Sequence, residues 1–254
     1  WECMGIKLHL ARHCLFRRNV LRRLRHAGGI WLDCSNVNNR ITDNVFTDIA
    51  SLCGGVFMEM SYEQNLIDHN VFWDIRDPDG GSLEWGGGAG VRADCNEALV
   101  VAHNVFGHIQ GHAVMFSLNQ SERRHEGRTG LCHRNTAVNN VFYRCPHRIH
   151  LGRRAENVCD GNLYDGADDN CAFEIIHPAP RCVQNLAGWQ QYFSLDPHSI
   201  QAALTMTFDP ETGALQWQAD GPLPATQSPQ GLPAEAQTER PGPYRAMAEE
   251  GALR

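Results

Sequence analysis

Apolar and polar residues recur along this chain in a unit of about two dozen residues. The plainest marker is the tripeptide Asn-Val-Phe, found at residues 44–46, 70–72, 104–106 and 140–142, with weaker copies at 19–21 and 162–164. The successive asparagines are 25, 26, 34, 36 and 22 residues apart. Repetition at such a period indicates a solenoid built from one repeated supersecondary unit.

A second motif lies upstream of these asparagines and alternates between apolar and other residues with a period of two. It begins with Gly or Ala and occupies residues 5–9, 29–33, 55–59, 90–94 and 113–117. A period of two is that of a β-strand with one buried face. Short strands in units of 22–26 residues predict an all-β fold, a right-handed parallel β-helix of the pectate-lyase-like kind with about three strands per coil.

Two other repeat folds fit the pattern less well. The Leu-x-x-Leu-x-Leu signature of leucine-rich repeats is missing, and a β-propeller needs blades of about 40 residues. In a parallel β-helix, equivalent residues of neighbouring coils lie about 4.8 Å apart. The repeated asparagines should therefore form a ladder at a turn, and four phenylalanines should stack inside the coils, namely Phe46, Phe72, Phe106 and Phe142.

The repeat divides the chain into three segments. Residues 1–176 are predicted to form a β-helix catalytic domain, residues 177–220 a C-terminal coil and cap, and residues 221–254, rich in Pro, Ala and Gln, a tail that is disordered or loosely draped. The chain begins with Trp rather than Met, so we expect N-terminal coils to be missing, and either a cytoplasmic or a secreted protein fits. Insertions at 76–89 and 118–130 interrupt the repeat, and such loops border the binding face of solenoids.

Net charge, apolar runs and cysteine spacing limit the kinds of partner and of site that the chain can have. The net charge of −7 gives no electrostatic support for binding nucleic acid or a membrane surface. No apolar run approaches the roughly 20 residues of a membrane-spanning helix. The ten cysteines include no CxxC pair, which favours buried thiols over disulfides or metal ligands. Cys34, Met60 and Cys95 fall at equivalent positions that should point inward.

The register of the predicted strands indicates which side chains lie next to one another on the surface. The residues that face outward should form two columns along the solenoid. One column is Lys7, Trp31, Phe57, Arg92 and Met115, and the other is His9, Asp33, Glu59, Asp94 and Ser117. Asp33 and Glu59 should lie about 5 Å apart on adjacent coils. Retaining glycosidases use two carboxyl groups at roughly 5–5.5 Å, and neighbouring carboxylates split their pKa values. Two other interpretations of the acidic column are a calcium site, because Ca²⁺ binds carboxylate oxygens, and an ordinary solvated surface without a function.

Four stretches of the chain resemble glycoside hydrolase family 120: residues 29–33 (GIWLD), 40–46 (RITDNVF), 56–59 (VFME) and 65–70 (NLIDHN). This resemblance implies a retaining β-xylosidase on a right-handed β-helix, with Asp33 as the nucleophile and Glu59 as the acid/base. Residues 1–9 are similar to a family segment in which a His-Glu pair contacts the sugar. Only the Glu of that pair is present, as Glu2.

We therefore expect exo-acting, retaining hydrolysis of β-xylosides or xylo-oligosaccharides. Trp31 would form a hydrophobic wall for the sugar, and the further candidates for substrate binding are Glu2, Lys7, His9, Arg92, Asp94, Arg123 and His125. No cofactor is expected, with calcium as the ion that the acidic column could accept. Two rivals stay open: a calcium-dependent polysaccharide lyase acting on a uronate polysaccharide, and a non-catalytic carbohydrate-binding β-helix.

Overall fold

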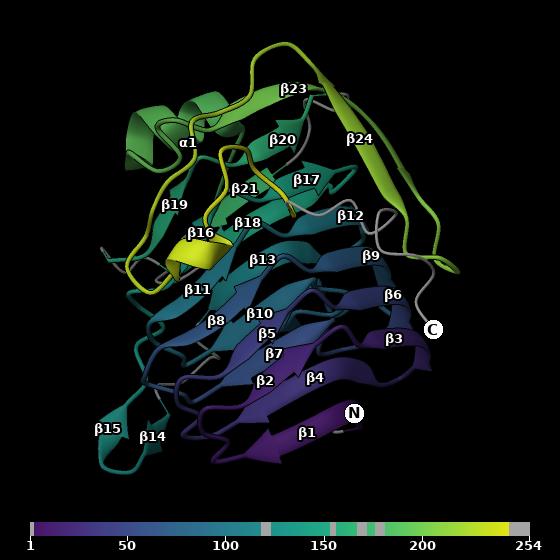
Figure 1. The fold of residues 1–254 in the computed structure, drawn as a ribbon. Coiled ribbons are helices and arrows are strands. Elements are labelled where there is room, and N and C mark those ends of the chain that lie inside the picture. The colour runs from purple at the N-terminus through teal and green to yellow at the C-terminus, as the bar shows by residue number, and fades with distance from the viewer. Residues whose placement is uncertain (1–2, 118–122, 153–155, 167–171, 176–180, 244–254) are drawn as a thin grey trace.

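The computed structural model describes residues 3–117, 123–152, 156–166, 172–175 and 181–243, and almost half of these residues lie in β-strands of three sheets (Figure 1). The first sheet contains β1 (Met4–His9), β4 (Gly28–Asp33), β7 (Val56–Glu59), β10 (Val91–Asp94), β13 (His112–Ser117), β18 (His147–Leu151), β21 (Ala172–Ile175) and β22 (Cys182–Gln184). The second contains β2 (Leu15–Arg17), β5 (Arg40–Thr42), β8 (Asn65–Asp68), β11 (Leu99–Ala102), β16 (Thr136–Val138) and β19 (Val158–Asp160). The third contains β3 (Val20–Arg25), β6 (Val45–Ala50), β9 (Val71–Arg76), β12 (Val105–Ile109), β17 (Val141–Tyr143), β20 (Leu163–Asp165), β23 (Ile200–Phe208) and β24 (Leu215–Asp220).

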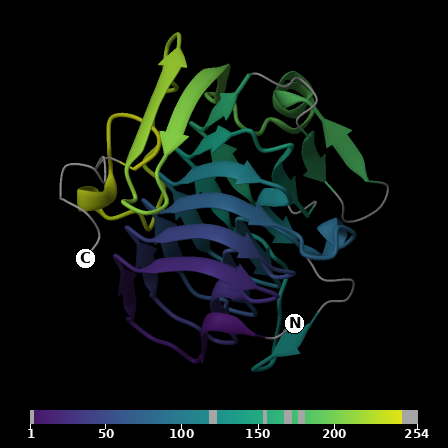
Figure 2. The ribbon, with the colours of Figure 1, turned by 90° about the vertical axis from the view of Figure 1, so that its right-hand side faces the viewer.

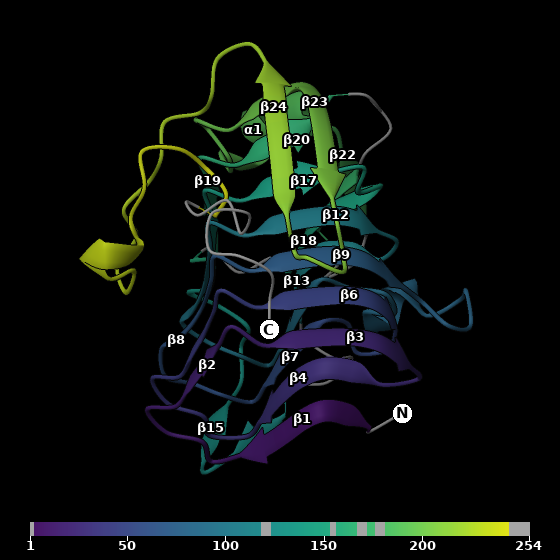
Figure 3. The ribbon, with the colours of Figure 1, turned by 45° about the vertical axis from the view of Figure 1, so that its right-hand side comes forward.

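The chain visits the three sheets in turn, and we call each such passage a coil. Neighbouring strands in a sheet come from successive coils and pair in parallel, as in the order β1-β4-β7-β10-β13. Figures 2 and 3 show these coils stacked on one another from the N-terminal end upward. Within the described residues the antiparallel pairs are β21–β22, β23–β24 and the small hairpin of β14 (Arg124–His125) with β15 (Arg128–Thr129).

The repeated asparagines form the ladder that the sequence predicts. The side-chain amide of each donates to Oδ1 of the next at 2.9–3.2 Å, in the series Asn19, Asn44, Asn70, Asn104, Asn140 and Asn162. The backbone N–H of each also donates to that same oxygen. From Asn44 onward the ladder is fully buried. The asparagines thus satisfy backbone groups where each coil turns between sheets.

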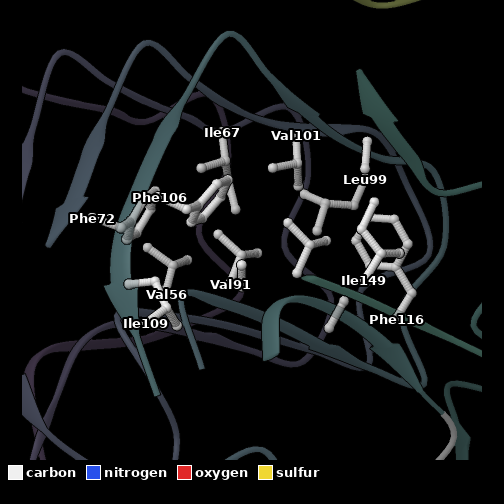
Figure 4. Packing of buried hydrophobic residues seen from close by; sticks show 14 of the residues in the cluster. Val56, Ile67, Phe72, Val91, Leu99, Val101, Phe106, Ile109, Phe116 and Ile149 are labelled. Atoms are coloured by element: carbon white, nitrogen blue, oxygen red, sulfur yellow. The ribbon is translucent and has the colours of Figure 1, made fainter. Parts of the chain in front are cut away.

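The aromatic stack inside the coils is also confirmed. Ring centroids of Phe46, Phe72, Phe106 and Phe142 follow one another at 4.7, 4.9 and 5.2 Å, and Tyr164 continues the stack at 4.8 Å. These rings belong to one apolar core enclosed by the three sheets. Figure 4 shows Val56, Val91 and Ile67 packed against the same rings from the other two sheets.

The α-helix α1 (Leu186–Phe193) covers the end of the stack (Figure 1). The Asn185 side chain caps its first turn with a hydrogen bond of 2.9 Å. Trp189 is fully buried, with its ring centroid 5.4 Å from that of Phe173, and its indole N–H donates to Asp196 at 2.9 Å. Covering the last coil keeps its apolar interior from water. No helix among the described residues has both the length and the apolar character needed to cross a membrane.

Of the two alternatives predicted for the tail, disordered or draped, residues 221–243 adopt the second. This segment runs along the second sheet and includes the short 3₁₀ helix η2 (Ala234–Ala236). Leu232 and Ala236 are buried in a cluster with Leu66 and Val100 on the outer side of that sheet. The proline-rich composition suggested disorder, but exposed apolar side chains of the sheet gain from being covered. Residues 244–254 lie outside the described residues.

The cysteines are free thiols wherever the structure describes them, and Cys53, Cys132 and Cys159 are among those that are buried. The inward placement of Cys34, Met60 and Cys95 is wrong. Each has a positive φ, of 51°, 42° and 50° respectively, which ends the alternation of the preceding strand. These side chains pack with Tyr62 in a cluster of their own, separate from the main core.

Candidate functional site

Three acidic residues of the first sheet, Asp33, Glu59 and Asp94, stand in one row that spans five strands. The register pairs His9 with Asp33, Asp33 with Glu59, Glu59 with Asp94, and Asp94 with Ser117. The predicted column is therefore confirmed, with adjacent members one strand spacing apart, about 4.8 Å. In β4, β7 and β10 the acidic residue is the last of the strand, because the next residue adopts a left-handed conformation.

Asp33 is held by three side chains. Lys7 Nζ and His9 Nε2 approach the same oxygen, Oδ2, at 3.5 and 3.2 Å. The Cys34 thiol donates to Oδ1 at 3.0 Å. Burial, followed by this contact with Asp33, raises the pKa of Cys34 to about 12, so the thiol stays protonated as a donor. The Asp33 side chain is 11% exposed, whereas that of His9 is 56% exposed, so the column is open at this end.

Glu59 lies deeper and has one charged partner. Arg123 Nη1 donates to Glu59 Oε1, and the glutamate side chain is only 7% exposed. Burial raises the pKa of Glu59, an effect that Arg123 opposes and that the charges of Asp33 and Asp94 reinforce. The structure thus places a carboxyl group with an elevated pKa next to Asp33, whose carboxylate contacts two basic side chains.

Asp94 and Arg92 form a buried ion pair. Arg92 Nη2 donates to Asp94 Oδ2 at 3.2 Å, and its guanidinium lies over the ring of Phe57, 4.5 Å from the centroid. The side chains are 8% and 1% exposed. The insertion at 76–89, with the 3₁₀ helix η1 (Leu83–Trp85), covers Arg92: a Cβ at Gly86 would stand 2.6 Å from Arg92 Cδ. Arg92 lies under this insertion and Asp94 is bonded by Arg92, so this structure does not support the prediction that both bond sugar hydroxyls.

The prediction that Trp31 forms a wall for the sugar is also wrong. Its side chain is 2% exposed, and Lys7 Nζ lies 3.4 Å from the centroid of its ring. Trp31 packs on Phe57, with centroids 5.0 Å apart, and on Cys53. The indole is thus a support that holds the Lys7 ammonium beside Asp33 through a cation–π contact.

The insertion that contains the β14–β15 hairpin lies over the ends of these strands, beside the N-terminal coils (Figure 1). Besides Arg123 on Glu59, His125 Nε2 lies 2.8 Å from Ser35 Oγ. Of the two predicted loop residues, Arg123 therefore reaches the column, whereas His125 reaches Ser35, two residues past Asp33. Residues 118–122 of this insertion lie outside the described residues, as does Glu2.

A cavity of about 370 Å³ opens beside the hairpin, past the ends of β4 and β7. Its lining is mostly polar and charged, and consists of Arg12, Ser35, Asn36, Val37, Tyr62, Glu63, Glu126 and Arg128. The volume is within the usual range for small-molecule sites, about 300–1,000 Å³. Sequence reasoning missed Tyr62 and Arg128, whose guanidinium lies 5.0 Å from the tyrosine ring centroid, because they meet only when the insertion folds back.

Two groupings bear on metal binding at this site. His9, Asp33 and Cys34 offer ligand atoms within 4.8 Å of one another, although the Lys7 ammonium already approaches Asp33. The acidic column is a poor match for calcium. Asp33 faces Lys7 and His9, Glu59 faces Arg123 and Asp94 faces Arg92, so basic side chains already balance the three carboxylates that Ca²⁺ would need.

Comparison with known proteins adds no relative: no family model, no curated protein and no solved structure matches this chain.

Proposed function

We propose that the three-sheet stack is a right-handed parallel β-helix and that the protein is a retaining glycoside hydrolase. The fold proposal is supported by the cyclic order of the sheets and the in-register asparagine ladder. A right-handed path is the one that parallel crossover connections almost always take.

The observation that carries the proposed activity is the direct pairing of Asp33 with Glu59 on adjacent parallel strands. Both follow an inward-facing residue of the same strand, Leu32 and Met58, so both project away from the core. A spacing of about 4.8 Å between strands matches the roughly 5–5.5 Å between the carboxyl groups of retaining glycosidases. Inverting enzymes need a wider gap to hold a water between the two groups.

The surroundings of the two carboxyls support different roles. The pKa of Glu59 is raised by burial, which suits the group that must deliver a proton. Asp33 would attack the anomeric carbon as a carboxylate while Glu59 protonates the departing glycosidic oxygen. In the second step Glu59 would take a proton from water, whose oxygen attacks the same carbon and releases Asp33.

In this proposal Arg123 is an obstacle that substrate must displace. It donates to Oε1 of Glu59 and favours the ionised form of that carboxyl group. A substrate that pushes the insertion aside would free Glu59 and let its pKa rise. Lys7 and His9, at the open end of the column, would contact sugar hydroxyls.

β-Xylosides and xylo-oligosaccharides, cleaved from one end, are the proposed substrates because of the resemblance to glycoside hydrolase family 120. A panel of aryl glycosides, with proton NMR of the first-formed anomer, tests the class and the mechanism together. The proposal expects hydrolysis of the aryl β-xyloside with a β-anomer as the first product. An α-anomer formed first would contradict the retaining pair.

Azide rescue separates the two roles. Glu59→Ala with azide should yield a β-glycosyl azide, and Asp33→Ala with azide an α-glycosyl azide, because azide replaces water in the first case and the nucleophile in the second. Asp74→Asn, at a carboxylate that is 52% exposed and paired with Arg76 on β9, is the matched control and should keep full activity. If both alanine variants hydrolysed substrate like the parent, the pair would not be catalytic.

A further inference from the structure

A second group of chemically active side chains lies on the same sheet, nearer the C-terminal end of the stack. His112, His150 and Glu174 come from three successive strands, β13, β18 and β21. Their exposures are 0%, 1% and 0%. The register pairs Met115 with His150 and His150 with Glu174, so these two continue the column of Arg92 and Met115 across the sheet.

The three side chains converge on one point. His112 Nε2 lies 3.2 Å from Glu174 Oε2 and 3.4 Å from His150 Nδ1, and all three atoms lie within 4.8 Å of one another. Around a tetrahedral zinc ion with bonds of about 2.0–2.1 Å, two ligand atoms stand roughly 3.3 Å apart. The two separations from His112 Nε2, 3.2 and 3.4 Å, match those of ligands that share one ion, and the third pair of atoms lies within 4.8 Å.

Hydrogen bonding alone does not satisfy this arrangement. His112 Nε2 can carry one proton, yet it faces both a carboxylate oxygen and a second imidazole nitrogen. Glu174 Oε2 is fully buried, and its contact with His112 Nε2 at 3.2 Å does not have the geometry of a hydrogen bond, so within the described part of the chain this oxygen has no well-aligned donor. A buried carboxylate oxygen with a poorly aligned donor is costly, whereas a metal ion accepts a lone pair from every atom of the group.

The other carboxylate oxygen has the partners expected of an outer shell. Arg181 Nη2 donates to Glu174 Oε1 at 2.8 Å, and His147 Nδ1 lies 3.2 Å from the same atom. These contacts hold the carboxylate with Oε1 toward Arg181 and His147 and with Oε2 toward His112 and His150. Outer-shell hydrogen bonds of this kind orient the ligands of metal sites in proteins.

We propose that His112 Nε2, His150 Nδ1 and Glu174 Oε2 bind a divalent transition-metal ion, with Zn²⁺ as the best fit. Two imidazoles and a carboxylate suit zinc, whereas calcium and magnesium prefer sites made of oxygen atoms alone. Three protein ligands leave one coordination position for water. The ion ties three successive coils together, and it is independent of the proposed hydrolysis, which uses no metal.

Titration of the whole chain with Co²⁺ and Zn²⁺ tests the site. The expected result is one equivalent of Zn²⁺ by elemental analysis after dialysis, a rise in melting temperature, and a visible Co²⁺ spectrum typical of four or five nitrogen and oxygen ligands. Failure to retain stoichiometric Zn²⁺ would overturn the proposal. A sulfur-to-cobalt charge-transfer band for the bound ion would also overturn it, because that band assigns the ion to Cys34 with His9 and Asp33.

Single substitutions locate the ion. His150→Gln and Glu174→Gln should each weaken Zn²⁺ binding by roughly 100-fold or more, since even the loss of an outer-shell partner costs about 10–100-fold. His133→Gln is the matched control, because His133 contacts two glutamates, Glu97 at 3.2 Å and Glu156 at 3.3 Å. It should leave Zn²⁺ affinity unchanged. Unaltered affinity in His150→Gln would refute the assignment, and the Co²⁺ spectrum of the parent decides the question if that variant does not fold.

Discussion

The asparagine ladder supports a quantitative prediction, because each of its members makes a countable set of buried hydrogen bonds. Asn70 is fully buried and takes part in five. Its amide donates to Asn104 Oδ1 and to the carbonyls of Ile41 and Asp68, all at 2.9–3.0 Å. Its oxygen accepts from the backbone and the side chain of Asn44. Asn70→Ala removes all five while changing little apolar area.

The expected loss follows from these contacts. A buried hydrogen bond contributes about 1 kcal/mol net, and a buried group left without a partner costs about 1–3 kcal/mol. We therefore expect Asn70→Ala to lower the free energy of unfolding by about 5 kcal/mol, a large share of the roughly 5–15 kcal/mol that a natural domain possesses. Asn19→Ala, at the partly exposed end of the ladder, removes two donated bonds and should cost about 1 kcal/mol.

Urea unfolding followed by tryptophan fluorescence and by far-ultraviolet circular dichroism measures both losses, with linear extrapolation to water. Coincidence of the two probes establishes that the transition is two-state, which a solenoid does not guarantee. The reasoning would be refuted if Asn70→Ala were no less stable than Asn19→Ala. In that case the ladder would be a consequence of coil stacking and not a source of stability.

Three further predictions concern single residues. Arg123→Gln should move the alkaline limb of the pH profile of kcat/KM to higher pH, because Arg123 lowers the pKa of Glu59; an unmoved limb would show that the ion pair does not govern activity. Burial lowers the pKa of His103 to about 4, so the unfolded chain binds the extra proton between about pH 6.5 and 4. Stability should be fully present above that window and fall by about 3 kcal/mol across it, a slope that His103→Gln should remove in denaturant titrations. Phe106→Ala, which leaves a gap in the aromatic stack, should cost about 3–5 kcal/mol by urea unfolding, whereas an exposed change such as Tyr192→Ala should cost under about 0.5 kcal/mol.

The register of the acidic column was predictable because alternation and coil length are local properties. Once Gly29 and Gly55 begin equivalent strands, Asp33 and Glu59 must pair, since shifting one strand by a single residue would place its apolar side chains in water. The proposed zinc site was not predictable in the same way. His150 and Glu174 fall in a part of the chain where the repeat weakens. In addition, the pairing of β18 with β21 changes register between His147 and Ile149, just before His150.

By itself, the sequence determined which residues within the strands face the core, which ones stack, and that Asp33 and Glu59 share a row. These follow from the period of two within a strand and the near-constant length of a coil. Only the tertiary structure decided which members of the rows are accessible. Lys7, Phe57 and Cys53 pack on Trp31, and Arg92 pairs with Asp94. Arg123 reaches Glu59 because an insertion distant in sequence folds back over the sheet. Such contacts depend on loop conformations that no local periodicity encodes.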